Sequence, residues 1–179
     1  NKHNFRTRSS VLINIDRTTI LIDTSPDLRF QLYKAKCTDI DAVLFTHIHS
    51  DHVSGLPDMR SMSIINNKII PAFMPDEMQK TINYYKYIFE GDKDYQPFMS
   101  IEKLKKEFEI NKIKILTFKH NHGSIDVQTY KIGKFAYSTD LKNFYENDLD
   151  KLKNLDLWIV GLLRNDPHPS HAGFKQILD

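Results

Sequence analysis

Short apolar runs separated by polar residues open the sequence and predict β-strands. The runs VLINI at residues 11–15 and TILID at residues 19–23 enclose three polar residues, a spacing typical of a β-hairpin. Pro26 then favours the first turn of a short helix that ends before Cys37. The run AVLFT at residues 42–46 is compact and apolar, which predicts a buried strand. The first part of the chain is therefore expected to contain a hairpin, a helix and a buried strand.

The next segment changes from strand periodicity to helical periodicity. Residues 56–65, LPDMRSMSII, predict a helix, and residues 68–73 predict a further strand. Pro75 then opens a second helix that carries an apolar and aromatic stripe at helical spacing. The stripe consists of Met78, Ile82, Tyr85 and Phe89. Such a stripe is more typical of core packing than of a substrate-binding wall, so we interpret it as part of the core.

The second half of the sequence is rich in strand-like runs. Residues 103–106 are charged and predict a helical surface, and residues 173–178 begin another helix. Strands are expected at about residues 112–118, 126–132, 134–138 and 155–160, the last of them buried. Two groups of strands with helices outside predict an α/β (α+β) fold of the αββα sandwich type. No linker divides the sequence, so residues 1–179 are expected to form a single domain.

Composition and charge argue against some classes of partner but do not identify a substrate. The formal net charge is +2, with acidic and basic residues mixed, which gives no long-range argument for nucleic acid or an anionic membrane as the partner. Cys37 is the only cysteine, so a reducing compartment, the cytoplasm, is favoured. No apolar run approaches the about 20 residues that a membrane-spanning helix needs. We therefore expect no membrane partner, and a homodimer stays open.

Four potential metal ligands crowd into six residues directly after the predicted strand at 42–46. They are His47, His49, Asp51 and His52 in the run THIHSDH. In an extended segment His47 and His49 project to the same side and can grip one ion, whereas Asp51 and His52 follow the turn and can face a second ion. Three imidazoles in one loop would repel one another when protonated unless a metal holds them neutral. The run therefore predicts two adjacent divalent ions.

The spacing HxHxDH, followed by Gly55, resembles the first motif of the metallo-β-lactamase superfamily. The resemblance implies an αββα metallo-β-lactamase sandwich in which an aspartate, Asp23, buttresses the metal-binding loop. It also implies a histidine ligand for the first ion at His122 and an aspartate that bridges both ions at Asp140. His120 stays open as the alternative ligand, although a histidine directly before glycine fits the family better.

Three further motifs narrow the resemblance to one branch of that superfamily. The combination of RTRSS at 6–10, LIDTSPDLR at 21–29 and PHPSH at 167–171 resembles the phosphodiesterase branch related to the phosphonate-pathway cyclic-phosphate phosphodiesterase. In that branch a histidine at the position of His171 lies near the phosphate and can protonate the leaving oxygen, with His168 as the competing candidate here. The resemblance therefore implies a small-molecule or nucleotide-like phosphodiester as the substrate.

The mechanism implied by the resemblance uses a hydroxide that bridges two divalent metal ions, with Zn²⁺ favoured and Mn²⁺ as the alternative. Asp51 would orient the hydroxide and His171 would assist departure of the alcohol. A tRNA 3′-end endonuclease, and with it a nucleic acid partner, is less favoured because no long glycine- and proline-rich arm lies between His122 and Asp140. A thioester or β-lactam hydrolase, and a truncated relative that binds metal without catalysis, stay open.

The two ends of the sequence are atypical of a complete chain. Asn1 stands where an initiator methionine would be, and the sequence stops at Asp179. In the superfamily a further histidine ligand is supplied by a strand that would follow this point. We therefore expect the domain to be incomplete at its C-terminus.

Overall fold

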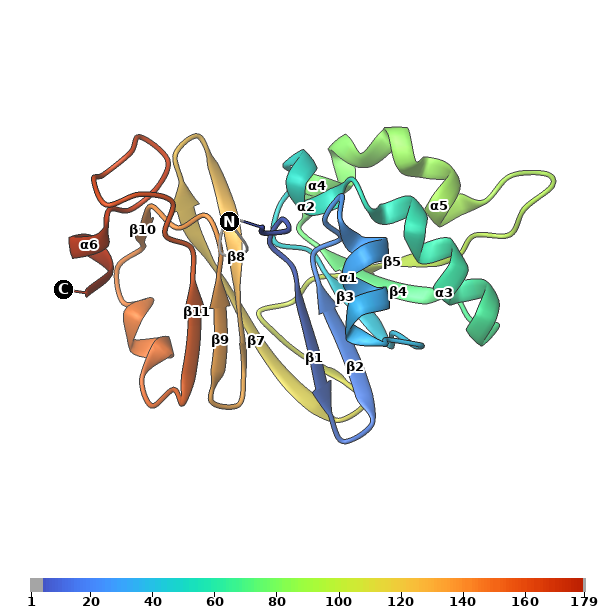
Figure 1. Cartoon of the computed structure of the whole chain (residues 1–179), viewed down its shortest axis with the longest axis horizontal. Helices are drawn as coiled ribbons and strands as arrows, with labels where there is room; N and C mark the ends of the chain where they lie inside the picture. The colour runs from blue at the N-terminus through green and yellow to red at the C-terminus, as the bar shows by residue number, and fades with distance from the viewer. Residues whose placement is uncertain (1–4, 179) are drawn as a thin grey trace. The chain divides into compact units, whose positions relative to one another are not determined.

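A computed structural model describes residues 5–178 of the chain. The fold is α/β with two mixed sheets, and the chain divides into two compact units, residues 1–104 and residues 105–179 (Figure 1). The predicted α/β class and the two groups of strands are confirmed, while the single domain expected over residues 1–179 stays a prediction. Within residues 5–178, no helix combines the length and the apolar character needed to cross a membrane.

The first unit contains one five-stranded sheet with the order β1-β2-β3-β4-β5. β1 and β2 are antiparallel, and every later pair is parallel. In chain order the elements are β1 (Val11–Ile15), β2 (Thr18–Ile22), α1 (Leu28–Ala35), β3 (Ala42–Leu44), α2 (Ser50–Val53), η2 (Leu56–Asp58), α3 (Met59–Asn66), β4 (Ile70–Met74), α4 (Asp76–Thr81), η3 (Ile82–Tyr85), α5 (Lys86–Glu90) and β5 (Met99–Lys103).

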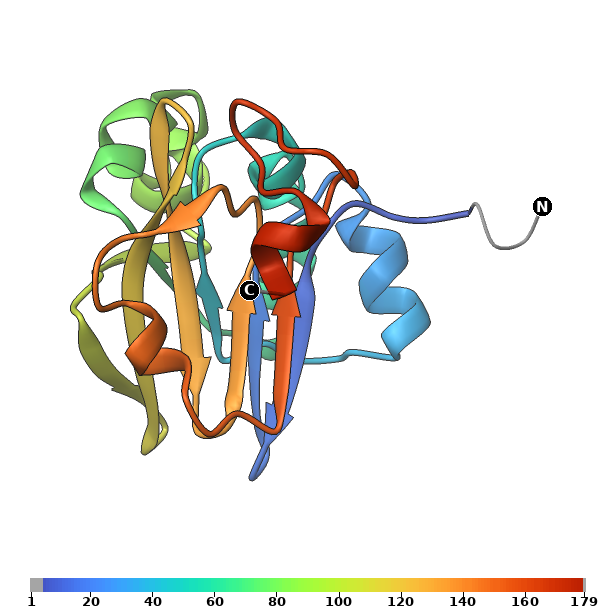
Figure 2. The ribbon, with the colours of Figure 1, turned by 90° about the vertical axis from the view of Figure 1, so that its left-hand side faces the viewer.

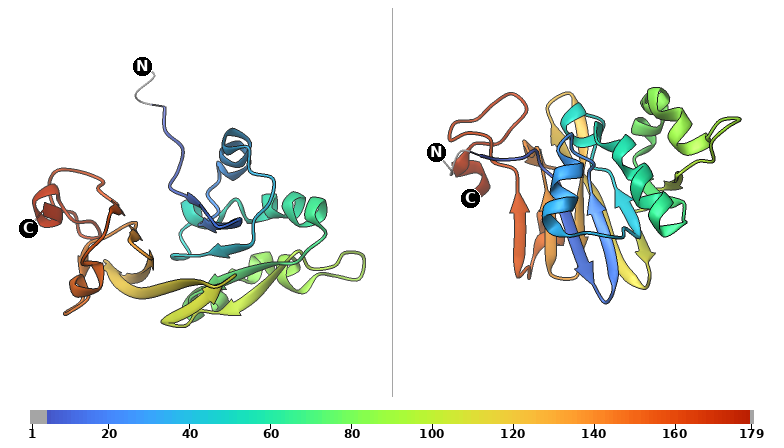
Figure 3. Two further views of the ribbon diagram at one scale, coloured as in Figure 1. Left: turned by 90° about the horizontal axis from the view of Figure 1, so that it is seen from below. Right: turned by 45° about the vertical axis from the view of Figure 1, so that its right-hand side comes forward.

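The predicted hairpin at the start of the chain is confirmed, as the blue strands in the right-hand view of Figure 3 show. Ile15 pairs with Thr18, so the loop has only two residues. These residues, Asp16 and Arg17, have φ angles of 47° and 66°. Positive φ at both loop positions is the backbone of a type I′ turn, whose twist matches that of the two strands. The turn is therefore tight although it lacks the glycine usual in such loops.

The core of the first unit brings the helices onto one face of its sheet. Leu28 and Leu32 of α1 and Met59 of α3 pack with buried strand residues such as Val43. The stripe at Met78, Ile82, Tyr85 and Phe89 packs against the same core, so its interpretation as core packing is confirmed. The predicted continuous helix is wrong, since the segment divides into α4, η3 and α5. Asparagine and adjacent tyrosines have modest helix propensity, which explains why the helix does not continue through η3.

The loop that follows β3 is held by backbone hydrogen bonds to the segment that follows β2. Asp23 donates its N–H to the Leu44 carbonyl at 2.9 Å, and Thr24 donates to the His52 carbonyl at 2.8 Å. Gly55 in turn donates to the Thr24 carbonyl at 2.9 Å. A Cβ at Gly55 would lie 2.1 Å from the Ser25 carbonyl oxygen, so only glycine permits this approach. These contacts fix the path of the histidine-rich loop.

The second unit contains a six-stranded sheet with the order β10-β7-β8-β9-β11, and β6 pairs with β7. The strands from β7 onward, coloured yellow to red, are seen along their length in Figure 2. β9 and β11 are parallel, and the other pairs are antiparallel. In chain order the elements are β6 (Glu107–Ile110), β7 (Ile113–His122), β8 (Ile125–Ile132), β9 (Phe135–Ser138), β10 (Asn143–Phe144), η4 (Leu149–Leu152), β11 (Leu157–Val160) and α6 (Phe174–Leu178).

The helical surface predicted at residues 103–106 is wrong. Lys103 is the last residue of β5, where it pairs with Met74 of β4. Lys106 accepts a backbone hydrogen bond from Thr117 of β7 at 2.9 Å. Four residues are too few for helix propensity to compete with strand pairing, because the first helical turn is costly to form. The charged run therefore joins two strands.

The strand predicted at residues 155–160 is confirmed as β11, but its predicted burial is wrong. Within the described chain β11 pairs only with β9 and lies at the edge of its sheet. Leu157 and Ile159 are 55% and 39% exposed, whereas the indole of Trp158 donates to Ser138 Oγ at 3.1 Å. An apolar run does not distinguish a strand buried on both faces from one buried on a single face.

Candidate metal centre

The seven residues predicted to bind metal or act in catalysis belong to two groups, one in each unit. The N-terminal ligand set, in the loop after β3 and in α2, consists of His47, His49, Asp51 and His52. The C-terminal ligand set, at the ends of strands or in the loop before α6, consists of His122, Asp140 and His171.

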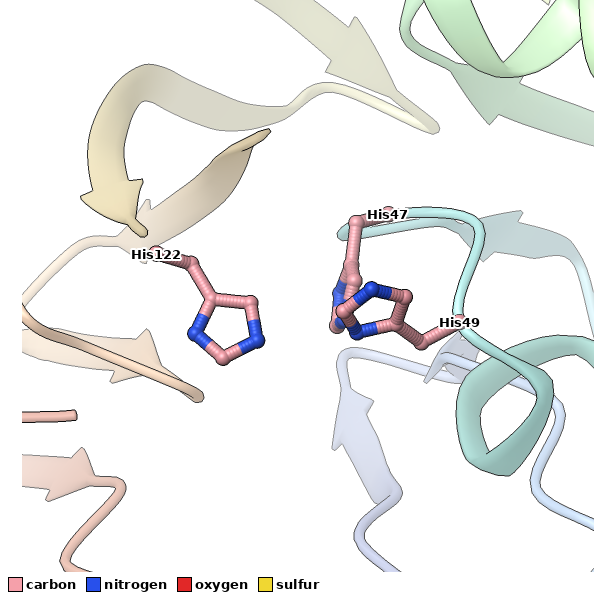
Figure 4. A group of neighbouring side chains, drawn as sticks. All are labelled: His47, His49 and His122. Carbon is pink, nitrogen blue, oxygen red and sulfur yellow. The ribbon is translucent and has the colours of Figure 1, made fainter. Parts of the chain in front are cut away.

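The N-terminal ligand set gathers three imidazoles, as predicted from the spacing. The ring centroids of His47 and His49 lie 4.6 Å apart and their planes cross at 75°. Figure 4 draws both side chains. The centroids of His47 and His52 lie 4.3 Å apart. His49 ends the extended segment, with ψ at 144°, and α2 begins at the next residue. The change from extended to helical backbone therefore brings His52 back toward His47.

Behind this set lies Asp23, whose side chain is fully buried. Its Oδ1 accepts the Thr46 backbone N–H at 2.8 Å, and its Oδ2 accepts the Thr46 hydroxyl at 2.8 Å and the His52 Nδ1–H at 2.7 Å. Burial raises the pKa of Asp23, and the hydrogen bonds from His52 and Thr46 act in the opposite direction. Asp23 therefore holds the histidine-rich loop in place, as the resemblance predicts, while metal binding by that loop stays a prediction.

The partners of Asp23 determine which nitrogen of two histidines carries the proton. A carboxylate only accepts hydrogen bonds, so the proton of neutral His52 is on Nδ1 and the lone pair is on Nε2. The Thr46 hydroxyl has one hydrogen, which it donates to Asp23, so it accepts from His47 Nδ1 at 2.9 Å. The lone pair of His47 is therefore also on Nε2. One buried carboxylate orients both rings, as is usual for metal-binding histidines.

Asp51 and His49 form the more open side of the N-terminal ligand set. The side chain of Asp51 is 55% exposed, and its Oδ2 lies 3.5 Å from His52 Nε2. His49 is exposed, whereas His47 is 3% exposed and His52 is 1% exposed. The set therefore combines two rings held in fixed orientations with two ligands that water can reach.

The C-terminal ligand set brings two imidazoles and a carboxylate together. One potential ligand atom from each of His122, Asp140 and His171 lies within 4.8 Å of the others. The ring centroids of His122 and His171 are 4.7 Å apart, and His171 Nδ1 lies 3.9 Å from Asp140 Oδ1. Burial lowers the pKa of His171, and the Asp140 carboxylate acts in the opposite direction. This set can thus offer nitrogen and oxygen ligands at a common point.

The two histidines of β7 differ in the partners of their nitrogens. His120 is fully buried, with Nε2–H donating to the Thr139 carbonyl at 2.8 Å and Nδ1 lying 2.8 Å from Thr129 Oγ1. Both nitrogens of His120 are thus engaged within the sheet. His122, drawn in Figure 4, donates from Nδ1 to the Ser170 carbonyl at 2.8 Å, which leaves the lone pair on Nε2. His122 rather than His120 has the chemistry of a ligand.

Both sets are compatible with a divalent metal ion, because imidazole nitrogen and carboxylate oxygen are ligands that Zn²⁺ prefers.

Reasoning from the sequence missed two groups that orient histidine rings, the Thr46 hydroxyl and the Ser170 carbonyl. A threonine directly before the first histidine was a signal for the former. A backbone carbonyl leaves no signal in the residue types.

Comparison with known families settles the relationship of the chain. Residues 18–179 match the family described as Beta-lactamase superfamily domain. The chain belongs to the metallo-β-lactamase superfamily. The resemblance first seen in the run THIHSDH and the predicted fold class are both confirmed.

Three similar proteins show how this member of the metallo-β-lactamase superfamily relates to others. It is 33% identical over 184 residues to an octanoyltransferase from Porphyromonas gingivalis, covering 99% of this chain and 37% of that protein. It is 25% identical over 129 residues to a ribonuclease Z from Methanopyrus kandleri, covering 66% of this chain and 41% of that protein. A crystal structure described as a new diphosphatase from the PhnP family is 28% identical, with a TM-score of 0.89, covering 98% of this chain and 68% of that chain.

The lengths of these relatives limit what their names imply. This metallo-β-lactamase superfamily chain spans about two fifths of the two curated relatives it matches, namely 37% and 41%. Most of the octanoyltransferase therefore lies outside the region that matches this chain.

Removing the Thr46 hydroxyl is expected to weaken Zn²⁺ binding. Thr46→Val eliminates the group that accepts from His47 Nδ1, so Zn²⁺ affinity, measured by competition with a chromophoric chelator, should fall about 10- to 100-fold. Thr46→Ser retains the hydroxyl and should bind nearly as the wild type does. Thr24→Val removes another buried threonine hydroxyl of the same region and serves as the matched control. Equal losses in Thr46→Val and Thr24→Val would contradict the role of Thr46.

The stability of the protein is expected to decrease in mild acid because of His120. Burial lowers the pKa of His120 from 6.5 to about 4. As the pH falls below the ordinary value, the unfolded chain binds the proton first, so stability is full above that value and decreases as the pH falls toward about 4. The free energy of unfolding in urea should drop by up to about 3 kcal/mol over this range. A His120→Asn variant should lose less, and an equal loss in both proteins would rule His120 out as the cause.

Proposed function

We propose that this chain carries the active site of a metal-dependent phosphodiesterase. The observation that carries this proposal is the orientation of His47, His52 and His122, each with Nδ1 bonded inside the protein and the lone pair on Nε2. Histidines with a purely structural role have no need to share one tautomer. Histidines that bind metal through Nε2 do need one.

We assign the ligands of two divalent ions, Zn²⁺ or alternatively Mn²⁺, from both sets. His47, His49 and His122 would hold the first ion, and Asp51 and His52 would hold the second. Asp140 would bind both, because one anionic bridge offsets the charge of two cations. Bound ions of this kind supply Lewis acidity and lower the pKa of a coordinated water to about 7.

The residues of the chain would complete the hydrolysis by moving protons. Asp51 is an exposed carboxylate 3.5 Å from His52 Nε2, and it would orient the attacking water and accept its proton. As the new bond between water oxygen and phosphorus forms, the bond from phosphorus to the leaving oxygen breaks. His171, beside Asp140, would donate a proton to that leaving oxygen.

The phosphodiester substrate is supported by the relatives rather than by a binding pocket. The diphosphatase structure matches 98% of this chain at 28% identity, and its name describes hydrolysis at phosphorus. Ribonuclease Z, 25% identical over part of the chain, is named for phosphodiester cleavage. The octanoyltransferase name describes acyl transfer instead. An acyl ester therefore belongs in the assay as the competing substrate.

The protein loaded with Zn²⁺ or Mn²⁺ is expected to hydrolyse bis(p-nitrophenyl) phosphate. Asp51→Ala should reduce kcat/KM by about 100-fold or more, since a proton acceptor typically contributes that much. Asp58→Ala, an acidic residue of the neighbouring η2, is the matched control and should retain the wild-type rate. Equal rates in wild type and Asp51→Ala would refute the mechanism. A higher kcat/KM for p-nitrophenyl octanoate than for the phosphodiester would refute the substrate class.

Loss of His171 should depend on the leaving group. A phenol with a pKa of about 10, as in tyrosine, needs protonation on departure, whereas the much more acidic p-nitrophenol leaves without help. His171→Ala should therefore slow hydrolysis of a diphenyl ester far more than that of bis(p-nitrophenyl) phosphate. The same fractional loss with both substrates would show that His171 does not act as the acid.

A further inference from the structure

A line of buried polar side chains crosses the sheet of the second unit. The strands β7, β8, β9 and β11 are neighbours in this order, and each contributes one residue to the line. These residues are His120, Thr129, Ser138 and Trp158. The first three are fully buried and the fourth is partly buried. A polar group in such a place is costly unless it is hydrogen-bonded, so each member needs its neighbour.

The hydrogen bonds of this line all run in one direction. Trp158 Nε1–H donates to Ser138 Oγ at 3.1 Å. His120 Nε2–H donates to the Thr139 carbonyl at 2.8 Å, so the neutral ring has its lone pair on Nδ1 and accepts the Thr129 hydroxyl hydrogen at 2.8 Å. Thr129 has then used its one hydrogen, so the Ser138 hydroxyl donates in the contact of 3.0 Å between the two hydroxyls. The last donor of the line is therefore the imidazole of His120.

The line ends on the peptide that joins Thr139 to Asp140. The carbonyl that His120 binds is the oxygen of this peptide, and the nitrogen of the same peptide is the Asp140 amide. The pairing of β9 with β11 ends at Ser138. The Thr139 carbonyl therefore lies beyond the paired part of the sheet and is bonded by a side chain instead. At the nitrogen end of the peptide, a Cβ at Gly161 would lie only 2.7 Å from Asp140 N, so the backbone packs closely there as well.

Asp140 has a backbone conformation that needs such support. Its φ is 50°, in the left-handed region that is unfavourable for most residues with a side chain, although aspartate tolerates it better than most. A residue in this region persists where the surrounding contacts fix its backbone. The angle φ is measured from the peptide that precedes Cα, so a change in the orientation of that peptide redirects the Asp140 carboxylate.

We propose that His120 is a positioning residue for Asp140. By holding the Thr139 carbonyl, His120 fixes the peptide from which Asp140 turns into the left-handed conformation, and with it the direction of the Asp140 carboxylate. The role of Asp140 as the bridge between two ions rests on the proposed function, but the hold of His120 on the peptide does not. From the sequence, His120 is only the alternative to His122 as a metal ligand.

Two amide side chains separate the functions of the two imidazole nitrogens. His120→Gln places its amide group near the position of Nε2 and can still donate to the Thr139 carbonyl. His120→Asn is one methylene shorter, so its amide group reaches only the position of Nδ1, beside Thr129. Thr117→Val is the matched control, because it removes a buried hydroxyl of the same strand that bonds elsewhere, to Gln128 and to the Thr129 carbonyl.

The first measurement reads the Asp140 conformation in the metal-free protein from the nuclear Overhauser effect between its own amide and Hα hydrogens. The effect is strong at positive φ, where these two hydrogens come close together. Wild type, His120→Gln and Thr117→Val should show the strong effect, and His120→Asn should show a weaker one. A strong effect in His120→Asn would overturn the proposal. An equally weak effect in His120→Gln or in Thr117→Val would also overturn it, because the donor to Thr139 would then not be the cause.

A second measurement uses the wild-type protein and does not depend on the folding of any variant. The imidazole ¹⁵N chemical shifts of His120 in weakly basic buffer should show its hydrogen on Nε2. A hydrogen on Nδ1 would overturn the proposal, because the ring could not then donate to the Thr139 carbonyl.

The third measurement is Zn²⁺ affinity by chelator competition. His120→Asn should bind at least about 10-fold more weakly than wild type, and His120→Gln and Thr117→Val should stay within about threefold. Wild-type protein that binds no Zn²⁺, together with the expected Overhauser effects in all variants, would refute the proposed function and leave the positioning role supported. Normal affinity in His120→Asn together with an unchanged Overhauser effect would refute the positioning role alone.

Discussion

The candidate metal centre depends first on the buried carboxylate of Asp23. It accepts hydrogen bonds from the Thr46 amide, the Thr46 hydroxyl and His52 Nδ1 within 2.8 Å. Burial would make an unpaired carboxylate very costly, so these three donors are required for Asp23 to stay in place. Since the donors come from the histidine-rich loop, the same requirement that stabilises Asp23 orients His47 and His52.

The C-terminal ligand set solves the same problem with a backbone group. His122 donates to the carbonyl of Ser170, which is neutral and needs no compensating charge. The Ser170 carbonyl belongs to the loop before α6, whereas Asp23 follows β2 and accepts three hydrogen bonds. The two sets therefore present the same histidine nitrogen by means of partners that differ in charge.

The parts of the fold that the sequence predicted are those with strong local patterns. The hairpin at 11–15 and 19–23, the strand before His47 and the apolar stripe after Pro75 depend on periodicity, which is a local property. The strand β5 was not predicted, because MSIEK has few β-branched residues and its pairing with β4 decides its conformation. The exposure of Leu157 also escaped prediction, since it depends on the position of β11 in the sheet.

The same distinction applies to the candidate site. The candidate ligand residues are recognisable because histidine and aspartate at that spacing are rare and match a family motif. Their orientation was only partly predictable, since Asp23 is a conspicuous buried acid but the Ser170 carbonyl is common to all residue types. His120 shows the limit most clearly, because its hydrogen bond to the Thr139 carbonyl arises from the order of the strands in the sheet, which no spacing in the sequence reveals.

The contacts that orient the N-terminal ligand set are also close together along the chain. The partners described here for His47 and His52 lie between Asp23 and His52, and Gly55 closes the segment against Ser25. Asp23 and His52 are only 29 positions apart, so bringing the partners together closes a short loop and costs little chain entropy.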